Sequence, residues 1–217
     1  MTKKVALVIG AGSSLGSAVA RCFAKDGLTA VVARRTGEEL SPLKKEIESF
    51  GGECHPFSLD ARKEEDVVNL INKIEDEIGE IEVAVYNIGA NIRFQIRETT
   101  SQKYYKVWEM AAFGAFLMGR EAAKKMVPRK KGTIIFTGAT ASVRGGEGFA
   151  AFAGAKHAKR ALAQSMAREL GPKGIHVAHV IIDGAIDTPW VRKLFPEYVK
   201  EKQKIDGLMN PDDIAKN

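Results

Sequence analysis

A glycine-rich turn near the start of the chain holds the first residues whose types and spacing could do chemistry. The apolar run Val5 to Ile9 leads directly into Gly10, Gly12 and Gly16, and a segment with helical periodicity follows. Glycine permits a tight turn and close approach of a ligand to the backbone, and the first N–H groups of a helix attract anions. This strand, turn and helix predict a site for the phosphates of a dinucleotide. The spacing G-x-G-x-x-x-G is one residue longer than the usual fingerprint, and a turn without a ligand is the alternative.

Two adjacent arginines could determine whether the site prefers NAD or NADP. Arg34 and Arg35 follow the second β-branched run, Thr29 to Ala33. A carboxylate at this place would bond the ribose 2′-hydroxyl of NAD, whereas arginine accommodates the 2′-phosphate of NADP. Ser13 in the glycine-rich turn is a further phosphate donor. We therefore expect NADP in preference to NAD, and a solvated basic pair is the alternative.

The elements that must position these residues alternate along the chain. Short β-branched runs are separated by longer segments with apolar residues at helical spacing, as in βαβ units around a sheet buried on both faces. We expect strands over Val5–Ile9, Thr29–Ala33, His55–Leu59, Ile81–Tyr86, Gly132–Thr137 and Ile175–Ile182. We expect a first helix directly after the first strand. Further helices are expected over Glu38–Phe50, along the apolar residues spaced from Val67 to Ile78, over Ser101–Met126 and over Phe149–Leu170. The expected fold class is α/β, a Rossmann-like doubly wound parallel sheet in a three-layer α/β/α arrangement.

Length and composition agree with one NAD(P)-binding domain over residues 1–217. The chain has 217 residues, of which 45% are apolar and 28% charged, and this excludes a disordered, collagen-like or disulfide-scaffold protein. Lys and Arg exceed Asp and Glu by 33 to 27, a net charge of +6. The basic residues are spread along the chain, and the densest group, Arg129 to Lys131 after Pro128, is typical of a solvated loop. Nucleic-acid binding is therefore the weaker alternative to a small-molecule substrate.

Cysteine and histidine patterns indicate neither a metal nor a redox site. Cys22 and Cys54 fit neither a C-x-x-C pair nor a zinc ribbon, so we expect two buried free thiols in a reducing, cytoplasmic compartment. His176 and His179 lie in an expected strand whose alternation sends them to opposite faces, and we assign no metal. No apolar run approaches the ~20 residues of a membrane helix, and glycines and serines interrupt the leader-like N-terminal segment.

The glycine-rich turn resembles the cofactor loop of the short-chain dehydrogenase/reductase family, T-G-x-x-x-G-x-G. Gly10 and Gly16 match its first and last glycines. Ser14 occupies the position of its middle glycine, and Ile9 occupies the position of its threonine. The resemblance implies that the cofactor is bound by Gly10, Ser13, Ser14, Leu15 and Gly16.

The resemblance extends over nearly the whole chain, and its motifs follow expected strands. The dipeptide D-A after the third strand is similar to the family's adenine-contacting motif, and Y-N-I-G after the fourth strand is similar to its N-N-A-G. The segment D-G-A-I-D-T after the sixth strand is similar to the nicotinamide loop P-G-x-x-x-T, with aspartate in place of proline. The resemblance therefore implies cofactor contacts from Asp60, Ala61, Asn87, Gly89, Ile186 and Thr188.

Most of the family's proton-transfer residues are missing from the expected positions. The family uses a tyrosine, a lysine four residues later, a serine thirteen residues before the tyrosine, and an asparagine. Lys156 matches the lysine and implies a cofactor contact, and the family's spacing then places Phe152 at the tyrosine position and Ala139 at the serine position. The asparagine position, three residues before Gly114, falls on Ala111. None of these three side chains can exchange a proton, so the resemblance implies impaired carbonyl reduction. Lys156 and Thr140 are the remaining catalytic candidates; a ribose-binding cation and an ordinary loop hydroxyl are the alternatives.

Two functions stay open at this point. The first is an NADP-dependent oxidoreductase with a departed active site, which transfers hydride to or from a small carbonyl, alcohol or enone. The second is a catalytically silent cofactor-binding protein that acts as a sensor or scaffold. The family places a substrate lid after the nicotinamide loop, where an apolar pocket or simple packing would involve Trp190, Leu194, Phe195 and Tyr198.

The resemblance also bears on assembly and on the end of the sheet. It implies a homo-oligomer in which the two long helices, over Ser101–Met126 and Phe149–Leu170, pack against their symmetry mates. Pro211 to Ala215 is typical of a helix start, and Asn217 follows after about one turn, whereas the family continues with a last strand. We therefore expect the sheet to be truncated before that strand, with the sixth strand at an open edge.

Overall fold

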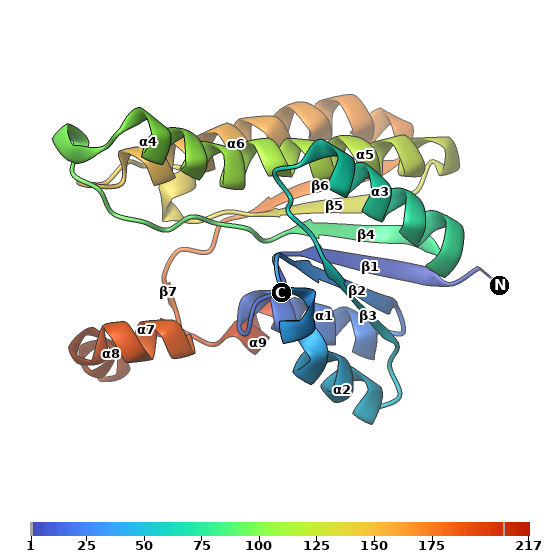
Figure 1. Cartoon of the computed structure of the whole chain (residues 1–217), viewed down its shortest axis with the longest axis horizontal. Helices are drawn as coiled ribbons and strands as arrows, with labels where there is room; N and C mark the ends of the chain where they lie inside the picture. Colours follow the sequence, from blue (N-terminus) through green and yellow to red (C-terminus); the bar gives the residue numbers. More distant parts are fainter. Residues whose placement is uncertain (1, 206) are drawn as a thin grey trace.

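The computed structural model describes residues 2–205 and 207–217 and contains a six-stranded parallel sheet between two layers of helices (Figure 1). The strands are β1 Lys4–Ile9, β2 Thr29–Arg34, β3 Cys54–Ser58, β4 Glu80–Tyr86, β5 Gly132–Thr137 and β6 Ile175–Val180. Their order is β3-β2-β1-β4-β5-β6, so the winding reverses between β1 and β4. The expected α/β doubly wound fold is confirmed. Ligands of such sheets bind beyond the carboxyl ends of the strands at this reversal.

Strand β1 shows why the chain folds this way, because its side chains are buried on both faces of the sheet. Val5, Leu7 and Ile9 belong to one apolar cluster, and Ala6 and Val8 belong to another. Each of the five is at most 1% exposed. A central strand covered on both faces needs such a continuous apolar run. The glycine-rich turn that follows β1 is thereby fixed at the middle of the sheet edge.

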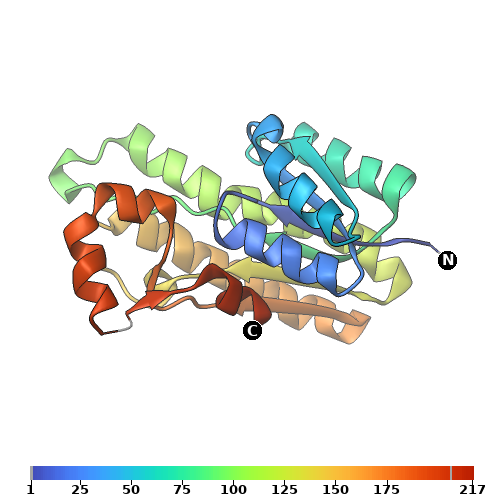
Figure 2. The same cartoon turned by 90° about the horizontal axis from the view of Figure 1, so that it is seen from below.

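Helices cover the two faces separately. Figures 1 and 2 show α3, α5 and α6 on one face and α1, α2 and α9 on the other. The helices are α1 Leu15–Lys25, α2 Ser41–Ser49, α3 Glu64–Lys73, α4 Ser101–Trp108, α5 Gly114–Arg129, α6 Ala150–Leu170, α7 Pro189–Leu194, α8 Pro196–Gln203 and α9 Pro211–Lys216. None of the helices in the described ranges has both the length and the hydropathy that a bilayer crossing requires.

The long helix expected over Ser101–Met126 is interrupted. A π-helical turn, Glu109–Phe113, separates α4 from α5, and α5 continues to Arg129. The hydroxyl of Tyr86 donates to the main-chain oxygen of Met110 in this turn over 2.7 Å. Wider π-turns need partners for the main-chain groups that they displace, and a buried tyrosine at the end of β4 provides one. The interruption depends on this tertiary contact and was not visible in the helical pattern.

The interpretation of Arg129 to Lys131 as a solvated loop is wrong for Arg129. Arg129 lies in the last turn of α5 and donates to both carboxylate oxygens of Glu75, over 2.5 and 3.0 Å. It also donates to the main-chain oxygen of Ile81 over 3.1 Å. The bidentate pair ties α5 to the π-helical turn Ile74–Ile78, and the bond to Ile81 ties it to the start of β4. The basic group therefore contributes a structural contact as well as surface charge.

Smaller differences concern boundaries and the cysteines. Gly37–Leu40 form a 3₁₀ turn, and α2 begins only at Ser41, whereas one helix was expected from Glu38. Both cysteines are free thiols, but only Cys54 is buried and Cys22 is half-buried. The expectation of two buried thiols is therefore correct for Cys54 alone.

The segment after β6 contains elements that the sequence pattern did not predict. Two short strands, β7 Ala185–Ile186 and β8 Leu208–Met209, pair in parallel. Helices α7 and α8 lie between these two strands in the sequence. The helix start expected at Pro211 is confirmed as α9, which packs against α1, where Arg21 pairs with Asp212 over 2.6 Å. Of the expected lid residues, Phe195 and Tyr198 are exposed, and the side chains of Trp190 and Leu194 lie outside the described part of the structure.

Candidate functional site

The glycine-rich turn is held against the ends of its neighbouring strands. Gly10 adopts the left-handed φ of +92°, and its N–H donates to the oxygen of Ala33 over 2.8 Å. The side-chain amide of Asn87 donates to the oxygen of Gly10 over 3.1 Å. A Cβ on Gly16 would lie 2.3 Å from that same oxygen, which real contacts do not allow. Gly10 and Gly16 are thus required by local geometry.

The other turn residues differ in what they offer to a ligand. Ser13 is exposed, and a Cβ on Gly12 would meet no atom within 4 Å. Ser14 precedes α1 with a negative φ of −133°, so it does not adopt the left-handed conformation that favours glycine. Leu15 is 6% exposed, so only its main chain could contact a cofactor. Ser17, which sequence reasoning missed, donates from its hydroxyl to the oxygen of Gly12 over 2.5 Å and braces the turn.

The two arginines after β2 have different surroundings. Arg34 pairs with Glu39 over 2.6 Å, and its side chain is one-third exposed. Arg35 is exposed and forms no ion pair with any residue in the described ranges. Arg35 is therefore the arginine available to a phosphate, and Arg34 would first have to leave Glu39.

The carboxylate of Asp60 is hydrogen-bonded to a neighbouring residue that sequence reasoning did not consider. Arg62 donates from Nε and Nη2 to the two carboxylate oxygens of Asp60, over 2.8 and 2.7 Å. This contact lowers the pKa of Asp60. Ala61, next to it, is buried and its main-chain oxygen faces Gly114. The carboxylate is thus fixed and charged at the end of β3, where the resemblance implies an adenine contact.

Lys156 lies close to the loop that follows β4. A Cβ built on Gly89 would be 3.6 Å from Nζ of Lys156. The Lys156 amine donates to the main-chain oxygen of Thr137 over 3.1 Å and lies 5.6 Å from the ring centroid of Phe152. Helix α6 therefore holds this buried amine against Gly89 in the loop after β4.

A second lysine on α6 accompanies it. Lys159 is fully buried and donates to the main-chain oxygen of Ile88 over 3.1 Å. Burial lowers its pKa well below the usual range, and the facing Lys156 lowers it further. Burial also lowers the pKa of Lys156 to about 8, although a hydrogen bond to Lys159 opposes this effect. Sequence reasoning missed Lys159, although its spacing from Lys156 placed it on the same helix face.

The three positions without proton-transfer groups lie in α6, in the π-helical turn between α4 and α5, and in the loop after β5. Phe152 is 7% exposed, and its ring faces Lys156. Ala111 is completely buried in the π-turn among other alanines. Ala139 follows β5, and its N–H donates to the hydroxyl of Ser142 over 3.1 Å. Ser142 is itself fully buried, so its hydroxyl braces this loop instead of replacing the missing serine.

Thr140 has a partner that the sequence did not predict. Its hydroxyl donates to a carboxylate oxygen of Asp183, the residue that replaces proline in the nicotinamide-loop pattern. Both side chains belong to loops at the carboxyl edge of the sheet, after β5 and β6. Thr140 and Asp183 therefore form a protic pair that Thr140 could not provide alone.

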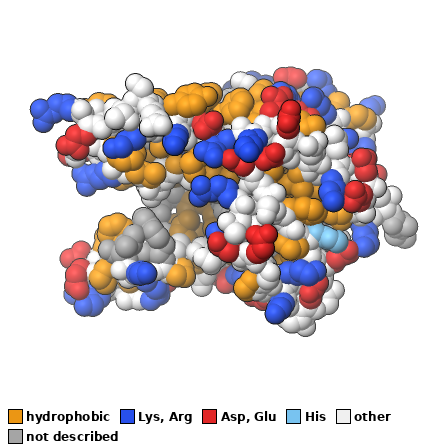
Figure 3. Space-filling view, in the orientation of Figure 1, with side chains coloured by type: hydrophobic (Ala, Val, Ile, Leu, Met, Phe, Trp, Pro, Cys, Tyr) orange, Lys and Arg blue, Asp and Glu red, His pale blue; other side chains and the backbone are white. Residues whose placement is uncertain are grey.

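The two expected contacts of the nicotinamide loop lie further along the chain. Ile186 pairs with Met209 in the small β7–β8 sheet. The hydroxyl of Thr188 accepts a hydrogen bond from Val191 N–H over 3.0 Å and caps α7. Figure 3 shows a hollow in the surface between the region of α4 and α6 and the region of α7 and α8. These two residues thus begin the segment that borders the hollow on one side.

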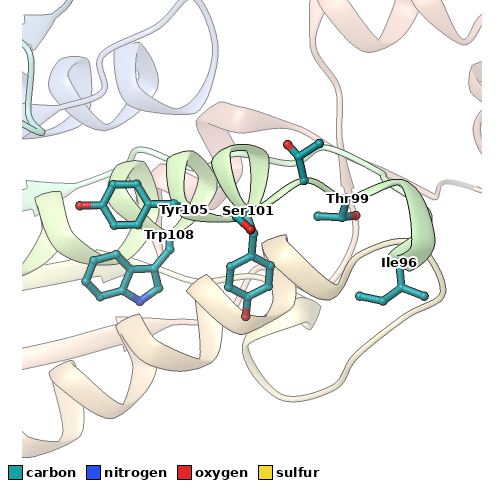
Figure 4. Close-up of a pocket in the computed structure, with 7 residues that line it drawn as sticks. Ile96, Thr99, Ser101, Tyr105 and Trp108 are labelled. Carbon is teal, nitrogen blue, oxygen red and sulfur yellow. The ribbon is translucent and has the colours of Figure 1, made fainter.

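A groove of about 610 Å³ on the surface of α4 is separate from these residues (Figure 4). Its lining is Ile96, Thr99, Thr100, Ser101, Tyr104, Tyr105 and Trp108. None of the expected cofactor residues contributes to it. Its open, aromatic lining is suited to contact with the surface of another protein, and it does not resemble a site for phosphates.

Comparisons with known proteins agree with this architecture. A family model described as short chain dehydrogenase matches residues 4–199. The chain is similar to short chain aldehyde dehydrogenase 1 of Euphorbia lathyris, with 31% identity over 214 residues that cover 95% of this chain and 73% of the relative. It is also similar to zerumbone synthase of Zingiber zerumbet, with 30% identity over 213 residues, 95% of this chain and 77% of the relative.

Solved structures give the same result. A short-chain dehydrogenase from Rhodopseudomonas palustris shares 47% identity and superposes with a TM-score of 0.80 over 95% of both chains. A short-chain type dehydrogenase/reductase from Mycobacterium marinum shares 28% identity, with a TM-score of 0.89 over 98% of this chain and 85% of that chain.

Proposed function

This chain belongs to the short-chain dehydrogenase family, and we propose that it binds NADP and transfers hydride to or from a small carbonyl, alcohol or enone through a departed active site. The family resemblance seen in the sequence is thereby confirmed, and a nicotinamide cofactor follows from it. The preference for NADP, the substrate class and the altered chemistry are the proposal. One observation carries it: the buried amine of Lys156 lies 3.6 Å from the Cβ position of Gly89, in the loop that follows β4 at the reversal of the sheet.

The residues present fit such a cofactor. A Cβ at Gly10 or Gly16 would meet atoms of the turn itself or of the loop after β4, so only glycine allows this tight turn at the start of α1, where a diphosphate would bind. Arg35 would meet a 2′-phosphate, since it has no carboxylate partner in the described structure. Asn87 holds the turn in place, and Lys156 would hold the ribose next to the reacting ring. When bound, NADP supplies or accepts the hydride.

The remaining protic groups determine how a proton could be supplied. With its pKa lowered to about 8 by burial, Lys156 is closer to neutral pH than an ordinary lysine and can give or take a proton there. Thr140 is the second candidate, because its hydroxyl is already bonded to Asp183. Hydride acceptors that need little protonic help, such as enones and activated ketones, suit a site with these two groups.

A silent cofactor-binding protein is the second candidate function. It is favoured by Phe152, Ala139 and Ala111, which leave the usual hydroxyl and amide positions without a protic side chain. General acid–base catalysis contributes typically ~10²–10⁴-fold, so the loss of these groups together could end turnover while cofactor binding persists.

One experiment separates the two. Fluorescence titration with NADPH and NADH establishes binding, and NADPH consumption is then followed with a panel of carbonyl compounds and enones. Binding with slow turnover supports the oxidoreductase, whereas binding without any turnover supports the silent protein. Failure to bind either cofactor contradicts both.

We further propose that residues 1–217 act as one domain in a homo-oligomer within a reducing, cytoplasmic compartment. Along α4 and α5, four rings lie about 6 Å apart in sequence order, Tyr105, Trp108, Phe113 and Phe116. Tyr105 is 58% exposed and Phe116 is 37% exposed, so this row offers apolar surface for a second copy. Two free thiols agree with reducing conditions. A light-scattering mass near 23.6 kDa at micromolar concentration would contradict the oligomer.

A further inference from the structure

The loops after β5 and β6 place a carboxylate beside the position at which a carbonyl oxygen would be polarised. The N–H of Gly138 donates to the oxygen of Val180 over 2.6 Å and joins the ends of the two strands. In the loops that follow, the hydroxyl of Thr140 donates to the carboxylate of Asp183. Ala139, at the expected position of the polarising serine, directly precedes Thr140. A negative charge therefore lies next to the point where the family resemblance implies a hydrogen-bond donor.

This carboxylate is not neutralised by a cation of the protein. Asp183 forms no ion pair with any lysine or arginine that the structure describes. The two amines of α6, Lys156 and Lys159, donate instead to the main-chain oxygens of Thr137 and Ile88. Asp183 is exposed and lies just before β7, at the start of the segment that borders the hollow in Figure 3. Its charge is therefore accessible to a cation that a ligand brings.

The charge at this point favours one kind of hydride acceptor over another. When a carbonyl accepts a hydride, negative charge develops on its oxygen, and donors aimed at that oxygen lower the barrier. A carboxylate beside the oxygen opposes this charge, and Ala139, Phe152 and Ala111 offer no donor that would offset it. When an iminium ion accepts a hydride, a positive charge disappears and no proton is required. The same carboxylate attracts such a cation.

The aromatic rings near the expected tyrosine position are also compatible with a cation. The ring centroid of Phe152 lies 5.6 Å from the amine of Lys156, and that of Phe149 lies 6.0 Å from the guanidinium of Arg93. The two rings lie 6.3 Å from each other. The faces of such rings attract cations. Phenylalanine in place of tyrosine therefore removes the proton donor but keeps a ring that a cation can approach.

We propose that the chain reduces small iminium ions and that Asp183, held by Thr140, binds their positive charge. The iminium carbon accepts a hydride from NADPH, and the π electrons of the C=N bond become the lone pair of the nitrogen. The products are a neutral amine and NADP⁺, and no proton is taken up. The inference rests on the proposed function for the cofactor and the hydride transfer, and it extends the acceptor from C=O to C=N⁺.

The probe is 2-methyl-3,4-dihydroisoquinolin-2-ium, an iminium ion whose charge is permanent, and the neutral comparison is 1-phenylpropane-1,2-dione. NADPH consumption is followed at saturating NADPH, with a blank without protein for each compound. We expect the starting protein to reduce the iminium ion. Asp183→Asn keeps an oxygen for the Thr140 hydroxyl, and it should raise KM for the iminium ion about tenfold or more. KM for the dione should not rise.

The matched control is Asp76→Asn, which removes an exposed carboxylate in the π-helical turn Ile74–Ile78 and should change neither KM. A second measurement needs no turnover. The ion 2,2-dimethyl-1,2,3,4-tetrahydroisoquinolin-2-ium has the same charge but cannot accept a hydride. Calorimetric titration should show that it binds the starting protein and binds Asp183→Asn about tenfold more weakly. Circular dichroism shows whether each variant folds.

Three results would overturn the inference. The first is an equal KM for the iminium ion in the starting protein and in Asp183→Asn, and the second is a parallel loss for the iminium ion and the dione. The third is a starting protein that does not reduce the iminium ion. If that protein still binds NADPH, the iminium proposal fails alone; if it binds neither nicotinamide cofactor, the proposed function fails as well.

Discussion

Asn87, at the end of β4, donates from its side-chain amide to the main-chain oxygen of Gly10 over 3.1 Å. The contact joins the two strands at which the winding of the sheet reverses. The main-chain N–H of Asn87 also donates to the oxygen of Ile9 over 2.8 Å. One residue thus fixes the glycine-rich turn from a strand that is distant in sequence, so the turn is held in place by the fold around it.

Gly16→Ala should destabilise the protein, and Gly12→Ala should not. The added methyl at position 16 would lie 2.3 Å from the oxygen of Gly10 and 2.7 Å from Cα of Ala11, whereas at position 12 it meets open space. Overpacking of this kind costs about 1–3 kcal/mol, and open surface substitutions stay within about 0.5 kcal/mol. Urea unfolding of the two variants measures the difference. Equal free energies of unfolding would show that the turn adapts.

Arg35→Ala should weaken NADPH binding by about 1.5–3 kcal/mol, roughly ten- to a hundredfold, and leave NADH binding unchanged. Arg35 has no carboxylate partner in the described ranges, whereas Arg34 is held by Glu39. The matched control is Arg168→Ala, at an exposed position near the end of α6. Fluorescence titration with both cofactors is the measurement. A parallel loss for NADPH and NADH would remove the argument for a 2′-phosphate contact.

Lys159→Met should change how stability depends on pH. Burial lowers the pKa of Lys159, so below its unfolded value near 10.4 the unfolded chain binds a proton that the folded protein excludes. The starting protein should therefore gain stability relative to Lys159→Met as the pH rises, by up to about 1.4 kcal/mol per unit between about pH 7 and 9. Urea unfolding at several pH values checks this, with Lys106→Met as the exposed control. Parallel profiles would mean that Lys159 is charged in the folded protein.

The sheet could be predicted from the sequence because buried parallel strands leave a direct signal. Val5 to Ile9 is an uninterrupted apolar run, and only a strand covered on both faces requires one. The break between α4 and α5 left no such signal, since Glu109 to Phe113 continue a helical pattern. Its cause is the hydroxyl of Tyr86, which reaches Met110 from β4. A contact between elements cannot be seen in the periodicity of either one.

The residues of the candidate site that belong to sequence motifs could be predicted, whereas the buried and paired charged residues could not. Gly10 and Gly16 were visible as a motif, and the structure brings Asn87 to the same turn. Lys159 lies on the same helix face as Lys156, but a lysine in a sequence is ordinarily assigned to the surface, and here it is fully buried. Asp183 was noticed only as a missing proline, and its bond to Thr140 needed the tertiary structure.

Phe152→Tyr combined with Ala139→Ser should restore more carbonyl reduction than Phe152→Tyr alone. A tyrosine four residues before Lys156 would have its pKa lowered from about 10 by the adjacent cation, but the substrate oxygen would still lack a polarising donor. Such groups act as a unit, so their gains should be strongly non-additive. Restoring Ala111→Asn should then help proton supply. NADPH oxidation with 1-phenylpropane-1,2-dione compares the variants. A double variant that stays inert while binding NADPH would show that the substrate geometry is lost too.

The same assay on the starting protein and on Lys156→Met, at saturating NADPH, tests the proposed function most directly. Lys156 is the group that we expect to hold the ribose and to exchange the proton, so most of the turnover that the chain retains should depend on it. We expect the starting protein to oxidise NADPH measurably but below ~1 s⁻¹, under the range of ordinary enzymes, and Lys156→Met to be slower by about a hundredfold. Equal rates for the two proteins would contradict the account, because the proton and the cofactor would then be handled by groups other than Lys156.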